Sequence, residues 1–432
     1  MHGGSKPFGK QQFNSVSKPL KIAWGFTLLL YIVCSTTFFA GSDYVIISTL
    51  SLYAFLGMSA MCMIFRYGVK LDLYFGGLVV FAAAVIFGTF YSESYDTVNG
   101  TMYDYITMMV IVFCIMNYIS SEKDFILVLR SVMISGVTLS GFILINYGDE
   151  FFSTIASPIH GNFRFGSDLT NANSIGVTTA VGFVIGLAFV LNRRESILFK
   201  LFDAACTCFC GFFSIMTASK KAIIILAVGA FCVFVFKRDT RKHVLKKIAF
   251  IFVAVAVVAG LLYAIQNVPM FVNVNRRLST FTDYIQTGES GNVSDRERMQ
   301  LIEDGLGYFR ESPVFGKGTD ASKHYFGKYS HSNYVELLMN FGIVGFSIFY
   351  FGYLVISKRI LKRLFTKDAF GNTDVLAAIL FGIIVISGVG MVYYYDRFFN
   401  IIVAATAAYT SLYASSDTFK ALPDTKQAAK EQ

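Results

Sequence analysis

Long runs of apolar residues recur along this chain of 432 residues, and short polar or charged stretches separate them. A run of about 18 or more apolar residues is long enough to cross the roughly 30 Å hydrocarbon core of a bilayer as a helix. Because lipid tolerates only helices or closed barrels, the repeated runs predict an all-α polytopic membrane protein with about twelve transmembrane helices. The candidate spans lie at residues 22–40, 44–65, 71–91, 104–119, 125–147, 173–192, 197–217, 221–236, 248–267, 333–356, 375–394 and 398–414.

The polar segment 268–332 is too long to be a simple connector between two spans. An even number of spans returns both chain ends to one side, and Lys and Arg are concentrated in the short loops of that side, which is typical of the cytoplasm. No small-residue cleavage pattern follows the first span, so we expect it to be retained. The predicted division is cytoplasmic tails at 1–20 and 415–432, transmembrane helices 1–9 within 21–267, an extracytoplasmic loop at 268–332 and transmembrane helices 10–12 within 333–414.

The composition agrees with a membrane protein, since 55% of the residues are hydrophobic and only 15% are charged. The mean hydropathy of +0.57 excludes an ordinary soluble domain. The net charge of +9 does not indicate nucleic-acid binding, because most basic residues fall in the predicted cytoplasmic loops. The seven cysteines all lie in apolar spans, which favours packing roles over metal binding.

An amphipathic helix is expected within the long loop. Ser294-Asp295-Arg296-Glu297 has the pattern of a capping box, in which the first and fourth side chains satisfy each other's backbone donors. The helix should continue to about Glu311. Leu301 and Ile302 lie one turn after Arg298 on its apolar face. We expect this helix to lie on the membrane or on the mouth of the helix bundle and to present Arg298 toward it.

Several charged or titratable groups are expected on the extracytoplasmic side, at or near the ends of spans. Unneeded charge beside a membrane is expensive, so these residues are candidates for function. Ser219 can cap the helix that follows it, and the free backbone donors there add positive potential. The set suits a polyanion held at membrane level, such as a lipid-linked pyrophosphate, because arginine contacts phosphate oxygens bidentately without a metal. Its members are Arg164, Lys220, Lys221, Arg296, Arg298, Arg397 and His331.

Each of these residues also has a structural interpretation that the sequence leaves open. Arg164 could be a solvated loop residue, and Lys220 and Lys221 could extend along apolar surface to reach the interface. Arg296 could be a solvated residue at the start of a helix. His331 could be a capping residue at the start of the next span.

The chemistry that fits this set is glycosyl transfer without a metal. The chain lacks a P-loop, a paired-histidine zinc motif and a Gly-x-Ser-x-Gly motif, so we expect no metal ion and no other cofactor. Histidine has an unperturbed pKa of about 6.5 and can accept a proton from a sugar hydroxyl at neutral pH. Fixed cations beside His331 can stabilise a departing pyrophosphate.

Four short pieces of the sequence carry a resemblance to a known family, and together they cover about residues 160–345. They are Arg164-Phe165-Gly166 with Asn171-Ala172-Asn173, then Thr217-Ala218-Ser219-Lys220, then Arg298 followed by Pro313-Val314-Phe315-Gly316-Lys317-Gly318, and finally His331-Ser332-Asn333-Tyr334 with Gly342-Ile343-Val344-Gly345. In this order they resemble the O-antigen ligase and O-antigen polymerase (Wzy-type) superfamily of bacterial envelopes. Ala172 stands where the family usually has proline, Lys220 where it has arginine, and Ser332 where it has asparagine.

The resemblance implies roles for individual residues. Arg164 and Arg298 would hold the pyrophosphate of an undecaprenyl-linked glycan, and His331 would be the base for the acceptor hydroxyl or help to position it. The sugar would be transferred with inversion, with no nucleotide sugar and no divalent metal. Lys220 keeps the charge of the usual arginine but loses its bidentate fork. The candidate substrate-binding residues are Lys220, Lys221, Arg296, Asn171, Asn173, Asn333 and Arg397.

The preferred interpretation is a polymerase that joins undecaprenyl-pyrophosphate-linked repeat units into O-antigen, capsular polysaccharide or exopolysaccharide on the outer face of the bacterial cytoplasmic membrane. Its expected partners are the lipid-linked oligosaccharide, membrane lipid, a chain-length regulator and a flippase, and no nucleic acid. A ligase that passes the glycan to a lipid A core or another envelope acceptor is the alternative within the family. A glycolipid transporter is the alternative from another class. It would predict paired charges deep in the spans and internal repeats, whereas Arg130 is the only Lys or Arg within a span, away from its ends, and no repeat is visible.

Overall fold

The computed structural model describes residues 16–38, 43–66, 68–94, 97–148, 164–166, 171–192, 195–236, 293–365 and 371–420, together with short pieces between 248 and 279. Every regular element within these residues is a helix, as the hydrophobic pattern predicts. In chain order the helices are α1 (Lys18–Thr37), α2 (Val45–Phe65), α3 (Leu73–Thr89), α4 (Val98–Tyr118), α5 (Glu122–Tyr147), α7 (Ala172–Asn192), α8 (Ile197–Met216), α9 (Lys220–Phe236), α12 (Val293–Glu311), α13 (Ala321–Phe326), α14 (Asn333–Phe365), α15 (Asn372–Ser387) and α16 (Arg397–Lys420).

Seven helices are long and apolar enough to cross a membrane, namely α1, α2, α4, α5, α7, α8 and α14. Two shorter apolar helices, α3 and α15, lie among them. These helices indicate a multi-pass membrane protein. The total of about twelve spans and the side on which each loop lies stay predictions. The candidate span 248–267 falls largely outside the described residues.

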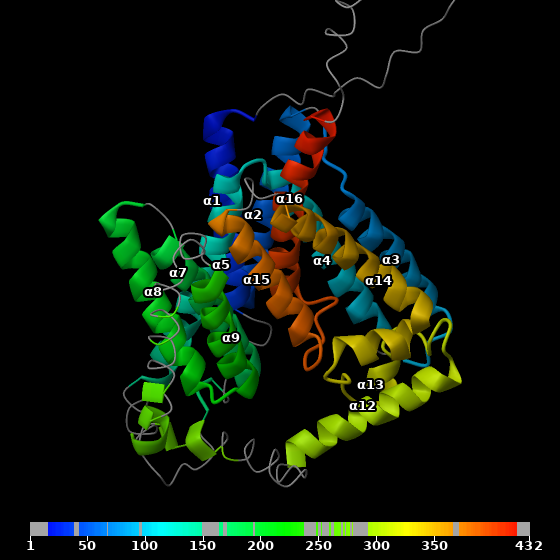
Figure 1. Cartoon of the computed structure of the whole chain (residues 1–432). Helices are drawn as coiled ribbons and strands as arrows, with labels where there is room; N and C mark the ends of the chain where they lie inside the picture. The colour runs from blue at the N-terminus through cyan, green and yellow to red at the C-terminus, as the bar shows by residue number, and fades with distance from the viewer. Residues whose placement is uncertain are drawn as a thin grey trace, which may run out of the picture.

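The helices form one bundle with α16 near its centre. α16 packs against α4, α5, α14 and α15, and its residues from Ile402 to Ala405 have no exposed surface. Small side chains at such positions let helices approach closely within a membrane. Figure 1 shows the start of α1 and the end of α16 at one end of the bundle, with α12 and α13 at the opposite end. We refer to the end that carries α12 and α13 as the loop end.

Helix α14 is broken near its start, although a single continuous span was expected at 333–356. Gly342 has φ 61° and ψ −166°, which interrupts the helix. The break exposes backbone groups that pair with the segment after α12: Ile343 N–H donates to the carbonyl of Pro313 at 2.9 Å, and Lys317 N–H donates to the carbonyl of Met339 at 2.8 Å. Backbone groups near a membrane interior must be satisfied within the protein, and these bonds do so while they fasten the 313–318 segment to α14.

Gly342→Ala is expected to destabilise the protein. The backbone conformation at Gly342 is nearly exclusive to glycine and costs of order 1–3 kcal/mol for other residues. A Cβ atom there would also lie 2.3 Å from the carbonyl oxygen of Val314. We expect a clearly lower melting temperature in detergent. Gly382→Ala is the matched control, because its added Cβ meets nothing within 4 Å. Equal melting temperatures for the two variants would contradict this account of the break.

Several helix ends differ from those expected from the hydrophobic runs. α15 ends at Ser387 and not near 394, because the chain turns at 388–390 and then packs against α14. α14 continues to Phe365 and α16 to Lys420, beyond their predicted spans. α12 begins at Val293, so Ser294 lies inside its first turn and does not precede it as a cap. The predicted end of that helix at Glu311 is confirmed.

Candidate functional site

The segments that carry most of the predicted cations and His331 meet at the loop end. The segment beginning at Arg164 lies against the turn between α8 and α9. That turn leads into Lys220, whose side chain reaches the first turn of α12. Arg298, one turn further along α12, lies close enough to His331 to influence its charge state. Residues far apart in the sequence therefore form a single cluster.

The turn between α8 and α9 is a tight, fully buried structure. Thr217, Ala218 and Ser219 have between 0 and 1% exposed surface. Ala218 has φ 49°, an uncommon conformation for a residue with a side chain. The Ser219 hydroxyl accepts a long bond of 3.5 Å from Ala222 N–H, in the manner of a helix cap. α9 therefore begins with Lys220 at a defined position and directs its free N-terminal amides toward the loop end.

Hydrogen bonds of its guanidinium fix Arg164 against this turn. Its Nε donates to the carbonyl of Thr217 at 3.0 Å, and its Nη2 donates to Oδ1 of Asn173 at 2.8 Å. The next residue, Phe165, is fully buried, and its N–H donates to the carbonyl of Met216. The structure thus brings Arg164 and Asn173 together with the Thr217 turn. Asn171 accepts a bond from Asn173 N–H and supports the start of α7.

Asp295 joins two of the predicted cations. Its Oδ2 lies 2.8 Å from Lys220 Nζ, and its Oδ1 lies 3.3 Å from Nη1 of Arg298. All three side chains are partly exposed, at 23 to 30%. The carboxylate therefore holds a lysine of α9 and an arginine of α12 in one place. It leaves a net positive charge at the cluster.

Arg298 retains unused hydrogen-bonding capacity. Its Nε is buried and has no hydrogen-bond partner among the described residues. A buried donor without a partner costs about 1–3 kcal/mol, so such a group in a cation cluster points to an oxygen ligand. A guanidinium presents five donors in a fixed fork, and Asp295 occupies only part of that fork. Arg298 can bind a phosphate group without leaving Asp295.

His331 lies in a short strained segment between α13 and α14. Its φ is 64°, in the left-handed region. Glu336 holds the segment from one side, since its Oε2 accepts from Ser330 N–H at 2.7 Å. Ser330 Oγ also donates to the carbonyl of Ser332. The His331 ring lies 4.4 Å from the ring of Tyr329, centroid to centroid. The backbone around His331 is thus fixed by its neighbours, which is a common property of functional sites.

The surroundings of His331 keep its imidazole neutral. Burial is the main cause that lowers the pKa of His331 to about 4, and the nearby positive charges of Arg298, Lys221 and Lys328 contribute to this shift. At pH 7 the ring therefore has a free lone pair and can accept a proton. The same effect shows that His331 experiences the charge of Arg298 and of Lys221 directly.

Lys221 is directed toward the segment after α15. Its Nζ donates to the carbonyl of Gly390, in a turn that the sequence did not single out. This contact ties α9 to the 388–390 turn beside His331. Lys221 therefore contributes positive potential to the cluster while it holds two parts of the chain together.

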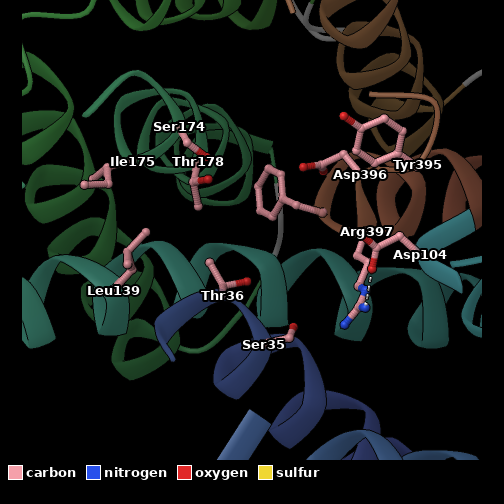
Figure 2. A pocket seen from close by; sticks show the side chains of 11 residues that line it. Ser35, Thr36, Asp104, Leu139, Ser174, Ile175, Thr178, Tyr395, Asp396 and Arg397 are labelled. Carbon is pink, nitrogen blue, oxygen red and sulfur yellow. Dashed lines mark hydrogen bonds and ion pairs between the residues drawn. The ribbon is translucent and has the colours of Figure 1, made fainter. Parts of the chain in front are cut away.

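The remaining candidates lie elsewhere. Asn333 is fully buried, and its Oδ1 accepts from the N–H groups of Tyr393 and Tyr394 at 2.9 and 3.0 Å, so its amide joins parts of the protein interior. Arg296 is exposed on α12. Arg397 lies apart from the cation cluster, where it forms an ion pair of 3.1 Å with Asp104 at the edge of a separate cavity (Figure 2).

Two functional neighbours were missed by sequence reasoning. Asp295 entered only as part of a capping pattern, although its position three residues before Arg298 is a signal for an ion pair on one helix face. Glu336 accepts a hydrogen bond from Ser330 N–H and so holds the segment that contains His331. No local sequence pattern predicts this contact. Among the described residues, no group of three or more His, Cys, Asp or Glu side chains could hold a metal ion.

A comparison with protein families agrees with this arrangement. A family model described as O-Antigen ligase matches residues 204–350. The match contains Lys220, Lys221, Asp295, Arg298 and His331, and it confirms the resemblance to the O-antigen ligase and polymerase superfamily. It points to an activity of the ligase or polymerase type. A comparison with curated proteins found no match.

Proposed function

We propose that this protein is a polymerase that joins undecaprenyl-pyrophosphate-linked oligosaccharide repeat units on the outer face of the bacterial cytoplasmic membrane. One observation supports the proposal above all: Arg298 and the neutral His331 lie in one cluster of cations. The buried Nε of Arg298 has no hydrogen-bond partner among the described residues. This pairing supplies a site for an anionic leaving group next to a proton acceptor.

The pyrophosphate of the donor lipid would bind to the cation cluster. Arg298 offers unused donors of its fork, Lys220 offers an ammonium, and the start of α9 offers backbone amides. Arg164 lies on the other side of the 217–219 turn and adds charge. Because these groups are already held by Asp295, Asn173 and the helix ends, they need little reorganisation when charge develops on the leaving group.

His331 would accept the proton of the acceptor hydroxyl. As the acceptor oxygen forms a bond to the anomeric carbon, the bond from that carbon to the phosphate oxygen breaks. The electron pair leaves with the undecaprenyl pyrophosphate, and the proton passes to His331. Attack from the face opposite the leaving group inverts the anomeric configuration. The cations take the charge-balancing role that a divalent metal has in many other phosphoryl-bearing sites, so we propose a metal-independent reaction.

The ligase is the second candidate, and the description of the matching family favours it. In that reaction the same donor site and base would be used, and the acceptor would be a lipid A core or another envelope glycan. We favour the polymerase because it needs no acceptor besides a second repeat unit. A flippase that delivers the repeat unit and a chain-length regulator are the partners that this function would require.

The deciding experiment is a reaction of the purified chain in detergent with the lipid-linked repeat unit as the sole substrate. We expect a ladder of products on a gel, equally strong with EDTA and with Mg²⁺. A ladder that forms only after a separate lipid-anchored acceptor is added would establish the ligase instead. Absence of product in both reactions, from protein with a normal melting temperature, would overturn the proposed transferase and favour transport.

A further inference from the structure

The cavity at whose edge Arg397 and Asp104 pair has no role in the reaction proposed above. It has a volume of about 350 Å³, within the range of roughly 300–1,000 Å³ that is typical of small-molecule sites. Its walls come from the ends of α1, α4 and α5, from the first turns of α7, and from residues 395–398 (Figure 2). It lies between helices that are far apart in the sequence.

Several polar groups line this cavity without hydrogen-bond partners in the described part of the chain. The hydroxyls of Ser174 and Thr178, one turn apart on α7, make no side-chain hydrogen bond to another described residue, and neither does the hydroxyl of Tyr395. Asp104 uses its Oδ1 for Arg397 at 3.1 Å. Figure 2 shows these side chains around a common space, and Phe398 also lines the cavity. Polar groups in such positions are satisfied by water or by a polar ligand.

The charge of the cavity is opposite to that of the cation cluster. Asp104 and Asp396 supply two carboxylates, and Arg397 supplies the one guanidinium among the residues that line it. A phosphate group would be repelled here, whereas an uncharged ligand rich in hydroxyl groups can both donate to the carboxylates and accept from the serine and threonine hydroxyls. The Phe398 ring offers an apolar surface to the carbon face of such a ligand.

The cavity and the cation cluster share structural elements. Asn173 of α7 holds Arg164, and the next residue, Ser174, lines the cavity. On the other side, Tyr395 lines the cavity and lies within electrostatic reach of Tyr329, whose ring contacts His331. The cavity is therefore linked through Asn173 to Arg164, and through Tyr395 and Tyr329 to His331.

We propose that this cavity binds an uncharged sugar of the glycan and so places it beside the cation cluster. The inference rests on the proposed function, because it assigns the sugar part of the substrate whose pyrophosphate the cations would hold. Sugars of the donor and of the acceptor both carry such hydroxyl groups, so either sugar fits the cavity. A site built to hydrogen-bond hydroxyl groups discriminates strongly against analogues that lack them, so the cavity would also select which repeat unit is used.

The test is the double variant Ser174→Ala, Thr178→Val, which removes two hydroxyls and keeps the shape of the side chains. The probe is the free repeat-unit oligosaccharide, released from its lipid, and binding to the full chain in detergent is measured by calorimetry. Loss of two hydrogen bonds is expected to weaken binding by about 30-fold. Thr179→Val is the control, since its hydroxyl bonds only to carbonyls of its own helix at 2.8 and 3.0 Å. The control should bind the sugar like the unaltered protein.

Inorganic pyrophosphate is the second probe and separates this inference from the proposed function. The double variant should bind pyrophosphate normally, whereas Arg298→Ala should not. If the double variant binds the oligosaccharide as tightly as the control, the cavity is not a sugar site, even where the cluster still binds pyrophosphate and polymer forms. If oligosaccharide binding is lost as expected but no glycan transfer occurs, the sugar site stands and the proposed function fails. A rise in KM confined to the lipid-linked donor, or to a soluble acceptor oligosaccharide, would identify which sugar occupies the cavity.

Discussion

Replacing His331 by alanine is expected to lower the rate of glycosyl transfer by about 10²–10⁴-fold, the usual contribution of a general base. On a gel this is loss of polymer. The physical reason is that the acceptor hydroxyl loses the group that takes its proton. The structure places this neutral imidazole within electrostatic reach of Arg298. The measurement is the rate of polymer formation per molecule of folded protein, with the melting temperature measured in parallel.

The backbone at His331 requires a second variant. Because its φ is 64°, alanine there adds strain that could lower the stability by itself. His331→Asn avoids this, since asparagine tolerates the left-handed region and cannot act as a base. His324→Ala serves as the control, because His324 is exposed and pairs with Glu93. Normal polymer from stable His331→Asn protein would remove the base role.

The pH dependence of the reaction rate tests the role of His331 as a base independently of the variants. A base must be deprotonated to act, and burial together with Arg298 and Lys221 lowers the pKa of His331 to about 4 in the free protein. The profile of kcat/KM, which reports the free enzyme, should therefore stay level as the pH falls from 7 and decline only near pH 4. Bound pyrophosphate opposes the charges of Arg298 and Lys221. The acid limb of kcat, which reports the complex, should consequently lie at higher pH.

Arg298→Lys is expected to reduce kcat by about 10²-fold, comparable to removal of one preorganised donor to a developing anion. A lysine keeps the positive charge but replaces a planar fork by a point charge. It can pair with Asp295 or reach the phosphate, whereas the arginine can do both through different nitrogens. Because the charge on the leaving group develops in the transition state, the loss should fall more on kcat than on KM.

A matched substitution on the same helix controls for the change of residue type. Arg310 lies exposed in the last turn of α12, and Arg310→Lys should leave the turnover unchanged. Near-normal turnover of Arg298→Lys would mean that Arg298 supplies only electrostatic potential. The fork geometry would then carry no part of the rate.

Most helices could be predicted from the sequence because the apolar runs are long and their ends are charged. The break at Gly342 could not, since a glycine within an apolar run fits a continuous helix as well as an interrupted one. What decides the matter is the segment 313–318, which offers backbone partners to the interrupted helix. The early end of α15 has a similar cause. The residues after Ser387 remain apolar, but the carbonyls of Gly388 and Met391 accept from Asn333 N–H and the helix does not continue.

The site was predictable as a set of cations but not as a geometry. Arg164, Lys220 and Arg298 were recognised because charge at the ends of spans is unusual, and the structure places them in adjoining positions. Asp295 joins Lys220 to Arg298. This contact follows only from the position of α12 against the bundle. The interior bonds of Asn333 could not be predicted for the same reason: an asparagine near a helix start fits a ligand and an interior bridge equally well until its neighbours are known.

The bonds from Lys221 to Gly390 and from Tyr393 to Asn333 link the two helices that begin at residues 220 and 333 to a segment nearer the end of the chain. During synthesis the N-terminal parts of a protein are made and fold first. The cation cluster and the turn that carries His331 lack these supports until α15 and the residues after it have been made. The site therefore matures in one late step, when the whole chain is nearly complete. The proposed reaction therefore requires a nearly complete chain.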